Sequence, residues 1–124
     1  MISHRLFRDH CWQTEEGIYI KDLRVLKNRS LENILLVDNA AYSYFYQLDN
    51  GIPIIPYYDD KSDRELIKLL EFLKEIIKAS EETSRSLKIL NSQYFKLDKY
   101  VKYDDINPLV QQLYQKEFKG NKMI

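Results

Sequence analysis

The chain has 124 residues, the size of one modest domain, and its 44% of hydrophobic residues are enough to build a core. Its 19 basic and 19 acidic side chains give a net charge of zero, which offers no support for electrostatic binding to nucleic acid or to an anionic membrane. The single cysteine, Cys11, cannot form an internal disulfide, and no apolar run approaches the roughly 20 residues of a membrane span. These features predict an intracellular folded domain with no membrane segment in this chain.

A β-hairpin is the first predicted element, over residues 4–20. Residues 4–12 alternate in the manner of a strand, and residues 18–20 form a second strand after a turn near Gly17. The next segment, residues 21–29, has Leu23 and Leu26 three positions apart, which indicates a short helix at most.

The continuous apolar run over residues 33–37 is typical of a strand that is covered on both faces, as in a parallel sheet. Asp38 and Asn39 follow it, at the edge of an open α/β sheet where ligands bind. Residues 40–51 are expected to form a loop or helical turn. Residues 52–58 are expected to be extended, and two prolines in that segment favour an edge strand.

The clearest predicted helix runs over residues 62–78. Ser62 is the expected N-cap, and Glu65 three residues later completes a capping box. Its apolar positions recur on one face, which is expected to cover the sheet: Leu66, Leu69, Leu70, Leu73, Ile76 and Ile77.

Residues 79–124 differ in character from the α/β pattern before them. They suggest a further helix or an extension of the first, then a loosely alternating stretch over 94–103. A short helix is expected after Asn107, with Pro108 at its first position. The chain is therefore divided into residues 1–78 and a helical or irregular extension, residues 79–124.

Five blocks of the first part, in the same order and at compatible spacing, resemble the C-terminal half of the NLI-interacting-factor-like phosphatases. These are small phosphatases of the RNA polymerase II C-terminal domain, in the haloacid-dehalogenase superfamily. The blocks are HRLFRDHC, GIYIKDL, ILLVDNAAYSY, LDNGIPI and YDDKSDRELIKLLEFLKEI. The resemblance implies a partial Rossmann-like α/β fold, with a parallel sheet, flanking helices and a β-hairpin, whose N-terminal strands are missing from this chain.

The resemblance also implies phosphoryl transfer through an aspartate. In that family the first Asp of an Asp-x-Asp-x-Thr motif attacks phosphorus, the second acts as general acid and base, and Mg²⁺ offsets the charge repulsion. This sequence contains no Asp-x-Asp. The chain is therefore expected to be inactive alone, and to bind Mg²⁺ weakly without that motif.

Four residues correspond to the supporting half of such a site. Lys21 falls on the lysine that steadies phosphate and nucleophile, and Asp38 on an acidic neighbour that orients it or a metal-bound water. Asn39 falls on a metal ligand, and Arg8 resembles an arginine on the substrate side that is able to fork onto phosphate. Without the family, Lys21 and Arg8 would be ordinary surface side chains, and Asp38 and Asn39 plain turn residues.

Three functions remain open at this point. The first is a Mg²⁺-dependent protein serine/threonine phosphatase acting on phosphoproteins in the nucleus or cytoplasm, of which this chain holds one half. The second is a non-enzymatic subunit of the mitochondrial inner-membrane import translocase, which has the same fold. The third is an inactive interaction domain that binds protein partners.

Overall fold

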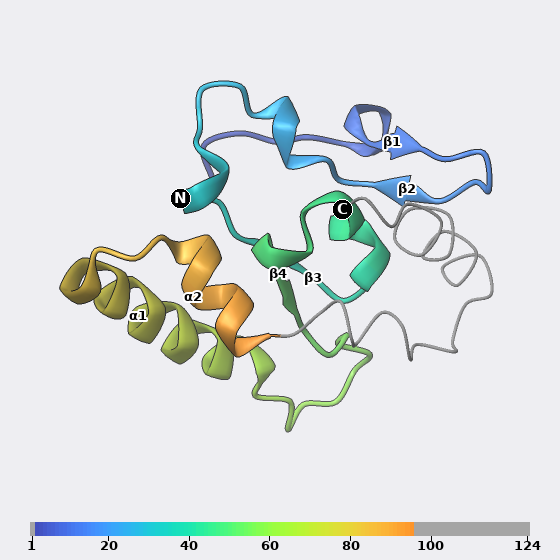
Figure 1. The fold of residues 1–124 in the computed structure, drawn as a ribbon. Coiled ribbons are helices and arrows are strands. Elements are labelled where there is room, and N and C mark those ends of the chain that lie inside the picture. Colours follow the sequence, from blue (N-terminus) through green and yellow to red (C-terminus); the bar gives the residue numbers. More distant parts are fainter. Residues whose placement is uncertain (1, 96–124) are drawn as a thin grey trace.

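The computed structural model describes residues 2–95, which contain both helices and strands (Figure 1). Two small sheets are present in this range. The strands β1 (Trp12–Gln13) and β2 (Tyr19–Ile20) pair antiparallel, and β3 (Leu36–Asp38) and β4 (Gly51–Pro53) pair parallel. The helices α1 (Glu65–Thr83) and α2 (Leu87–Tyr94) follow. This arrangement fits the expected partial α/β fold with a hairpin and a parallel strand pair.

The hairpin is shorter than the sequence predicts. Residues 4–12 were expected to form one strand, but the 3-10 segment η1 (Arg8–His10) interrupts them. The backbone N–H of His10 donates to the carbonyl of Phe7, and the His10 Nδ1 accepts from the Phe7 N–H, both at 2.9 Å. This local pair of bonds replaces strand pairing. The turn itself is as predicted, because Gly17 has a φ of +84°, which favours glycine.

The parallel pair β3–β4 is built around the segment that joins the two strands. This segment is the irregular 3-10 element η4 (Ala41–Asn50), which fits the expected helical turn. Its side chains Tyr44 and Phe45 are fully buried and form the core together with Ile18, Ile20, Ala41 and Leu48. Gly51 follows where a Cβ atom would lie 2.3 Å from the Tyr44 ring, so the close approach of β4 requires glycine there.

The run at residues 33–37 differs from its prediction in two ways. Its first residue ends the short 3-10 segment η3 (Leu31–Asn33), because the Ser30 side chain accepts from the Glu32 N–H and caps a turn. The residues from 34 to 38 are half-buried rather than covered on both faces. Within residues 2–95, the only strand that pairs with β3 is β4, so its other edge has no strand beside it.

Helix α1 begins and ends later than predicted. The helix begins at Glu65 with Arg64 as its N-cap, so Ser62 lies too early in the chain to cap it. The Ser62 hydroxyl donates to Asp60 at 2.6 Å, and Asp63 accepts from the Glu65 N–H at 2.8 Å. The helix ends at Thr83, before the left-handed Ser84. The predicted apolar face is only partly covered. Ile76 is buried, whereas Leu66 is 73% exposed.

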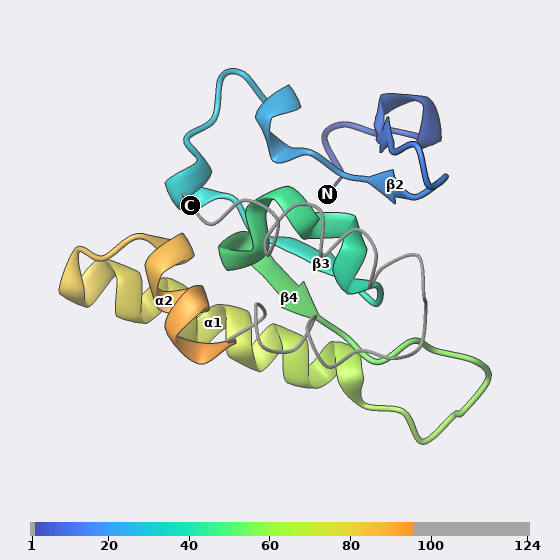
Figure 2. The ribbon, with the colours of Figure 1, turned by 45° about the vertical axis from the view of Figure 1, so that its right-hand side comes forward.

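Helices α1 and α2 lie side by side on the opposite side of η4 from the hairpin (Figures 1 and 2). Residues 79–95 therefore both extend the first helix and form a second one, as the two open alternatives allowed. Of the alternating stretch expected over 94–103, Tyr94 ends α2 instead and residues 96–103 lie outside the described residues, as does the helix expected after Asn107. The division of the chain at residue 79 stays a prediction, and α1 continues through that position.

Candidate active site half

A cleft of about 820 Å³ runs between the hairpin, the short 3-10 segment η2 (Leu23–Val25) and the end of β3. All four site residues predicted from the sequence line it: Arg8, Lys21, Asp38 and Asn39. They come from three separate parts of the sequence, so their convergence is a property of the fold. The remaining lining is mostly apolar.

Lys21 and Asp38 form an ion pair within this arrangement. The Lys21 Nζ lies 2.5 Å from Asp38 Oδ2. The Asp38 side chain is 9% exposed, whereas the Lys21 side chain is 50% exposed and lines the cleft. The largely buried carboxylate orients the partly exposed ammonium group, which keeps further N–H donors available in the cleft. That arrangement suits the binding of an anion such as phosphate.

Asp38 is held on its other side by the backbone. Its Oδ1 accepts from the Ala40 N–H at 2.9 Å, in the manner of Asp residues that stabilise the turn after a strand. The turn and the ion pair use different oxygens of one carboxylate. The two interpretations of Asp38 that the sequence left open, a turn residue and an orienting partner of Lys21, are therefore compatible.

Arg8 reaches the cleft from η1. Its guanidinium carbon lies 5.2 Å from the centroid of the Tyr19 ring, within the range of a cation–π contact. The ring supports the side chain and does not consume the N–H donors of the guanidinium group, which can turn toward a ligand. The role of Arg8 on the substrate side of the site stays a prediction.

The described residues do not by themselves make a magnesium site. Within residues 2–95 no group of three or more His, Cys, Asp or Glu side chains is placed to hold a metal ion. Asn39 is exposed in the cleft and offers one amide oxygen, while the Asp38 carboxylate is occupied by Lys21 and Ala40. Mg²⁺ requires six oxygen ligands, and it typically takes one or two carboxylates together with water. Magnesium binding stays a prediction that depends on carboxylates from outside this range.

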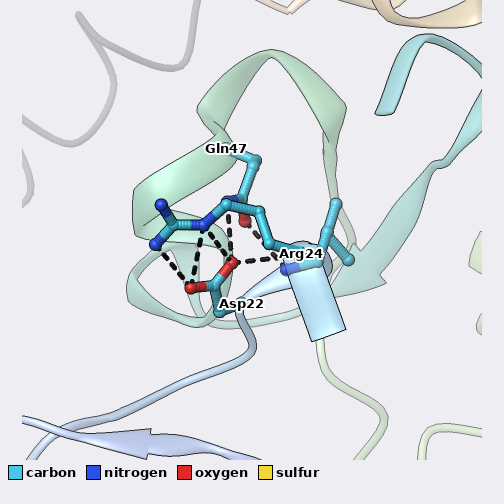
Figure 3. A network of polar contacts seen from close by, with 4 residues as sticks. Asp22, Arg24 and Gln47 are labelled. Atoms are coloured by element: carbon cyan, nitrogen blue, oxygen red, sulfur yellow. Dashed lines mark hydrogen bonds and ion pairs between the residues drawn. The ribbon is translucent and has the colours of Figure 1, made fainter. Parts of the chain in front are cut away.

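A polar network next to Lys21 was not predicted from the sequence. Figure 3 shows Asp22 between Arg24 and Gln47. The Arg24 Nη2 donates to Asp22 Oδ2 at 2.7 Å, and the Gln47 Nε2 donates to Asp22 Oδ1 at 2.9 Å. The Arg24 side chain, more than any other group, lowers the pKa of Asp22 from 3.8 to about 2, against the opposing effect of burial. Of these contacts, only the one within the turn could be predicted from the sequence, because Asp is a residue type that commonly caps the turn it begins.

Among residues 2–95, no helix combines the length and apolar character that crossing a bilayer requires.

Comparison with known proteins places the chain in one family. Residues 1–85 match the family model of the NLI interacting factor-like phosphatases. The CTD small phosphatase-like protein 3 of Caenorhabditis elegans is 49% identical over 75 residues, which are 60% of this chain and 25% of that protein. The human carboxy-terminal domain RNA polymerase II polypeptide A small phosphatase 1 is 38% identical over 77 residues, 62% of this chain and 29% of that protein.

A relative with a different role matches as well. The mitochondrial import inner membrane translocase subunit TIM50 of Candida glabrata is 37% identical over 86 residues, 69% of this chain and 17% of that protein. In all three comparisons, the chain spans less than a third of the relative's length.

Proposed function

Because the chain belongs to the NLI interacting factor-like phosphatase family, we propose that it carries the phosphate-binding half of a protein serine/threonine phosphatase site. The ion pair between Lys21 and Asp38, in the cleft that Arg8 and Asn39 also line, is the observation that supports this proposal most. Asp38 orients Lys21, and Lys21 and Arg8 bind the phosphate group of a phosphoprotein.

The nucleophile and the general acid come from outside this sequence, which has no Asp-x-Asp. An Asp-x-Asp-x-Thr segment would supply the two carboxylates that the described site lacks. With those carboxylates in place, Asn39 would complete the oxygen ligands of a Mg²⁺ ion, whose charge would offset the repulsion between nucleophile and phosphate. Alone, the chain holds an anion without being able to cleave it.

The name of the human relative suggests phosphorylated RNA polymerase II as one substrate, and hence the nucleus, with the cytoplasm as the other proposed location. The second candidate is a non-enzymatic protein-binding role in the mitochondrion. The TIM50 relative favours it, and the mostly apolar lining of the cleft is compatible with it. The ion pair between Lys21 and Asp38 favours the phosphatase, because a cleft that only binds protein does not need a lysine oriented to bind phosphate.

A fusion tests the proposed function directly. An Asp-x-Asp-x-Thr segment from an active family member is joined to the N-terminus of residues 1–124, and hydrolysis of p-nitrophenyl phosphate is measured with Mg²⁺. We expect activity that falls at least about 100-fold with Lys21→Ala, because the lysine stabilises charge that develops on the phosphate. Lys27→Ala is the matched control, since Lys27 is exposed and lies outside the cleft lining.

Equal activity of the Lys21→Ala and Lys27→Ala fusions would contradict the role of Lys21. A fusion that folds and binds Mg²⁺ but hydrolyses nothing would contradict the phosphatase assignment and favour the protein-binding candidate.

A further inference from the structure

The backbone around Lys21 is held by η4 at two points. The Lys21 N–H donates to the carbonyl of Ser43 at 2.7 Å, and the Leu23 N–H donates to Gln47 Oε1 at 3.0 Å. Leu23 is buried beside this contact. The two bonds lie one residue to either side of Asp22, so they fix the path of the chain from which the Lys21 side chain leaves.

Gln47 is suited to this contact by its place in η4. Its φ of −134° and ψ of 63° are not helical, and η4 is kinked at this residue. The side chain is buried and points at residues 22 and 23, as Figure 3 shows for Asp22. A buried amide side chain that makes long-range bonds at a kink stabilises one relative position of two segments.

The amide group of Gln47 satisfies two different partners at once. Its oxygen accepts from the Leu23 N–H, and its nitrogen donates to Asp22 Oδ1 at 2.9 Å. A carboxylate at residue 47 would still accept from Leu23, but it would face the Asp22 carboxylate with no proton to donate. The contact therefore requires both the acceptor and the donor that an amide side chain provides.

Asp22 is also bound by Arg24. The Arg24 Nε lies 3.0 and 3.1 Å from the two Asp22 oxygens, and the Arg24 backbone N–H donates to Oδ1 at 3.0 Å. The Arg24 guanidinium carbon lies 5.8 Å from the ring centroid of Tyr46, the neighbour of Gln47 in the sequence. The turn after Lys21 is thus fastened to η4 through side chains as well as backbone.

We propose that Gln47 is a positioning residue for Lys21. It fixes the Asp22–Leu23 peptide so that the Lys21 ammonium group meets Asp38 across the cleft. The Lys21 side chain is half exposed, so packing does little to restrict its rotamers, and the anchored backbone must define its direction. The importance of this for catalysis rests on the proposed function, but the positioning itself is a property of this chain alone.

A double-mutant cycle measures the proposed effect in the full chain without any substrate. Lys21→Met, Asp38→Asn and their combination give the coupling between the two side chains, as a ratio of unfolding equilibrium constants in urea. We expect a coupling of about threefold in the native background, which is typical of a partly exposed ion pair. In a Gln47→Ala background we expect the coupling to fall to near one.

A variant that only weakens the fold must leave this ratio unchanged, because it lowers the stability of all four proteins of the cycle by the same amount. Asn91→Ala is the matched control, since Asn91 is buried in α2 and bonds to the carbonyls of Asp49 and Gly51 rather than to the turn after Lys21. We expect the threefold coupling to persist in that background.

A swap of partners provides rescue and covers the case in which Gln47→Ala does not fold. Gln47→Glu alone places two carboxylates together, and we expect it to abolish the coupling. With Asp22→Asn added, the new amide at position 22 can donate to the new carboxylate at position 47, and we expect at least half of the coupling to return.

A coupling that stays at threefold in Gln47→Ala or Gln47→Glu would overturn the proposal and leave Gln47 a purely structural residue. That result would not bear on the phosphatase proposal, which the fusion experiment tests.

Discussion

At the residue scale, charge and hydrogen bonding are concentrated on two aspartates with different tasks. Asp38 holds Lys21 and the turn after β3, and Asp22 holds Arg24 and Gln47. Each carboxylate uses both oxygens. Asp22 holds the turn after Lys21 in place, while Asp38 orients the Lys21 ammonium group in the cleft.

The lowered pKa of Asp22 has a consequence for stability. A carboxyl group whose pKa is about 2 in the folded chain and near 3.8 when unfolded stabilises the fold above pH 3.8. That contribution is lost progressively as the pH falls from about 4 through 2. The partial exposure of the pair limits its size, and about 1–2 kcal/mol is a reasonable magnitude at neutral pH.

We therefore expect Asp22→Asn to lower the free energy of unfolding by about 1–2 kcal/mol at pH 7, and by much less at pH 2. Urea unfolding at a series of pH values measures this difference. Asp9→Asn serves as a control, since Asp9 is exposed and distant from this network in the sequence. A loss of stability for Asp22→Asn that is the same at pH 7 and pH 2 would show that the charge of Asp22 is not what stabilises the turn.

At the element scale, the second helix is tied to the strand that follows η4. Asn91 of α2 is fully buried, and its Nδ2 donates to the carbonyl of Asp49 at 3.0 Å and to that of Gly51 at 2.8 Å. Phe72 of α1 also packs against Tyr94, with ring centroids 4.9 Å apart. Helix α2 thus belongs to the folded unit although it lies beyond the family match at residue 85.

The expected result of Asn91→Ala is a loss of about 2 kcal/mol in the free energy of unfolding, because the buried carbonyl of Gly51 and the partly buried carbonyl of Asp49 lose their donor. Chemical denaturation of the full chain measures it, with Gln93→Ala on the exposed face of the same helix as control. If Asn91→Ala and Gln93→Ala both lowered the free energy of unfolding only slightly, α2 would not be part of the stable domain.

The elements that the sequence predicted well are those with local signals. Gly17 marks the hairpin turn, and the Asn50–Gly51 pair marks the exit from η4. The wrong predictions are those in which other local hydrogen bonds form in place of the expected pattern. Alternation over residues 4–10 resembled a strand, but no strand pairs with these residues in the described part of the chain. Ser62 had the pattern of a cap, but its N–H and hydroxyl both donate to Asp60 in a turn that precedes the helix, which begins at Glu65.

The candidate site shows the same division. Sequence blocks identified Lys21, Asp38, Asn39 and Arg8, and the fold brings all four to one cleft. The contact between Gln47 and Asp22 spans 25 positions and leaves no local pattern, so only the structure reveals it. The roles of the four cleft residues in binding phosphate or metal stay predictions, because geometry alone does not establish them.

At the scale of the whole molecule, the chain presents one side of the proposed active site beside apolar surface. The cleft contains an ammonium group paired with a carboxylate, one guanidinium group and an amide oxygen, while one edge of β3 has no strand beside it in residues 2–95. Leu66, Leu70 and Ile77 are exposed on α1. Such edges and faces favour association with further polypeptide.

Hydrolysis of p-nitrophenyl phosphate by purified residues 1–124 with Mg²⁺ tests the central claim, that this chain carries part of the proposed phosphatase site but supplies no nucleophile. We predict no hydrolysis above the rate in buffer, with or without Mg²⁺, because the sequence has no Asp-x-Asp to attack phosphorus. Magnesium-dependent hydrolysis that is abolished by Lys21→Ala and retained by Lys27→Ala would contradict the claim.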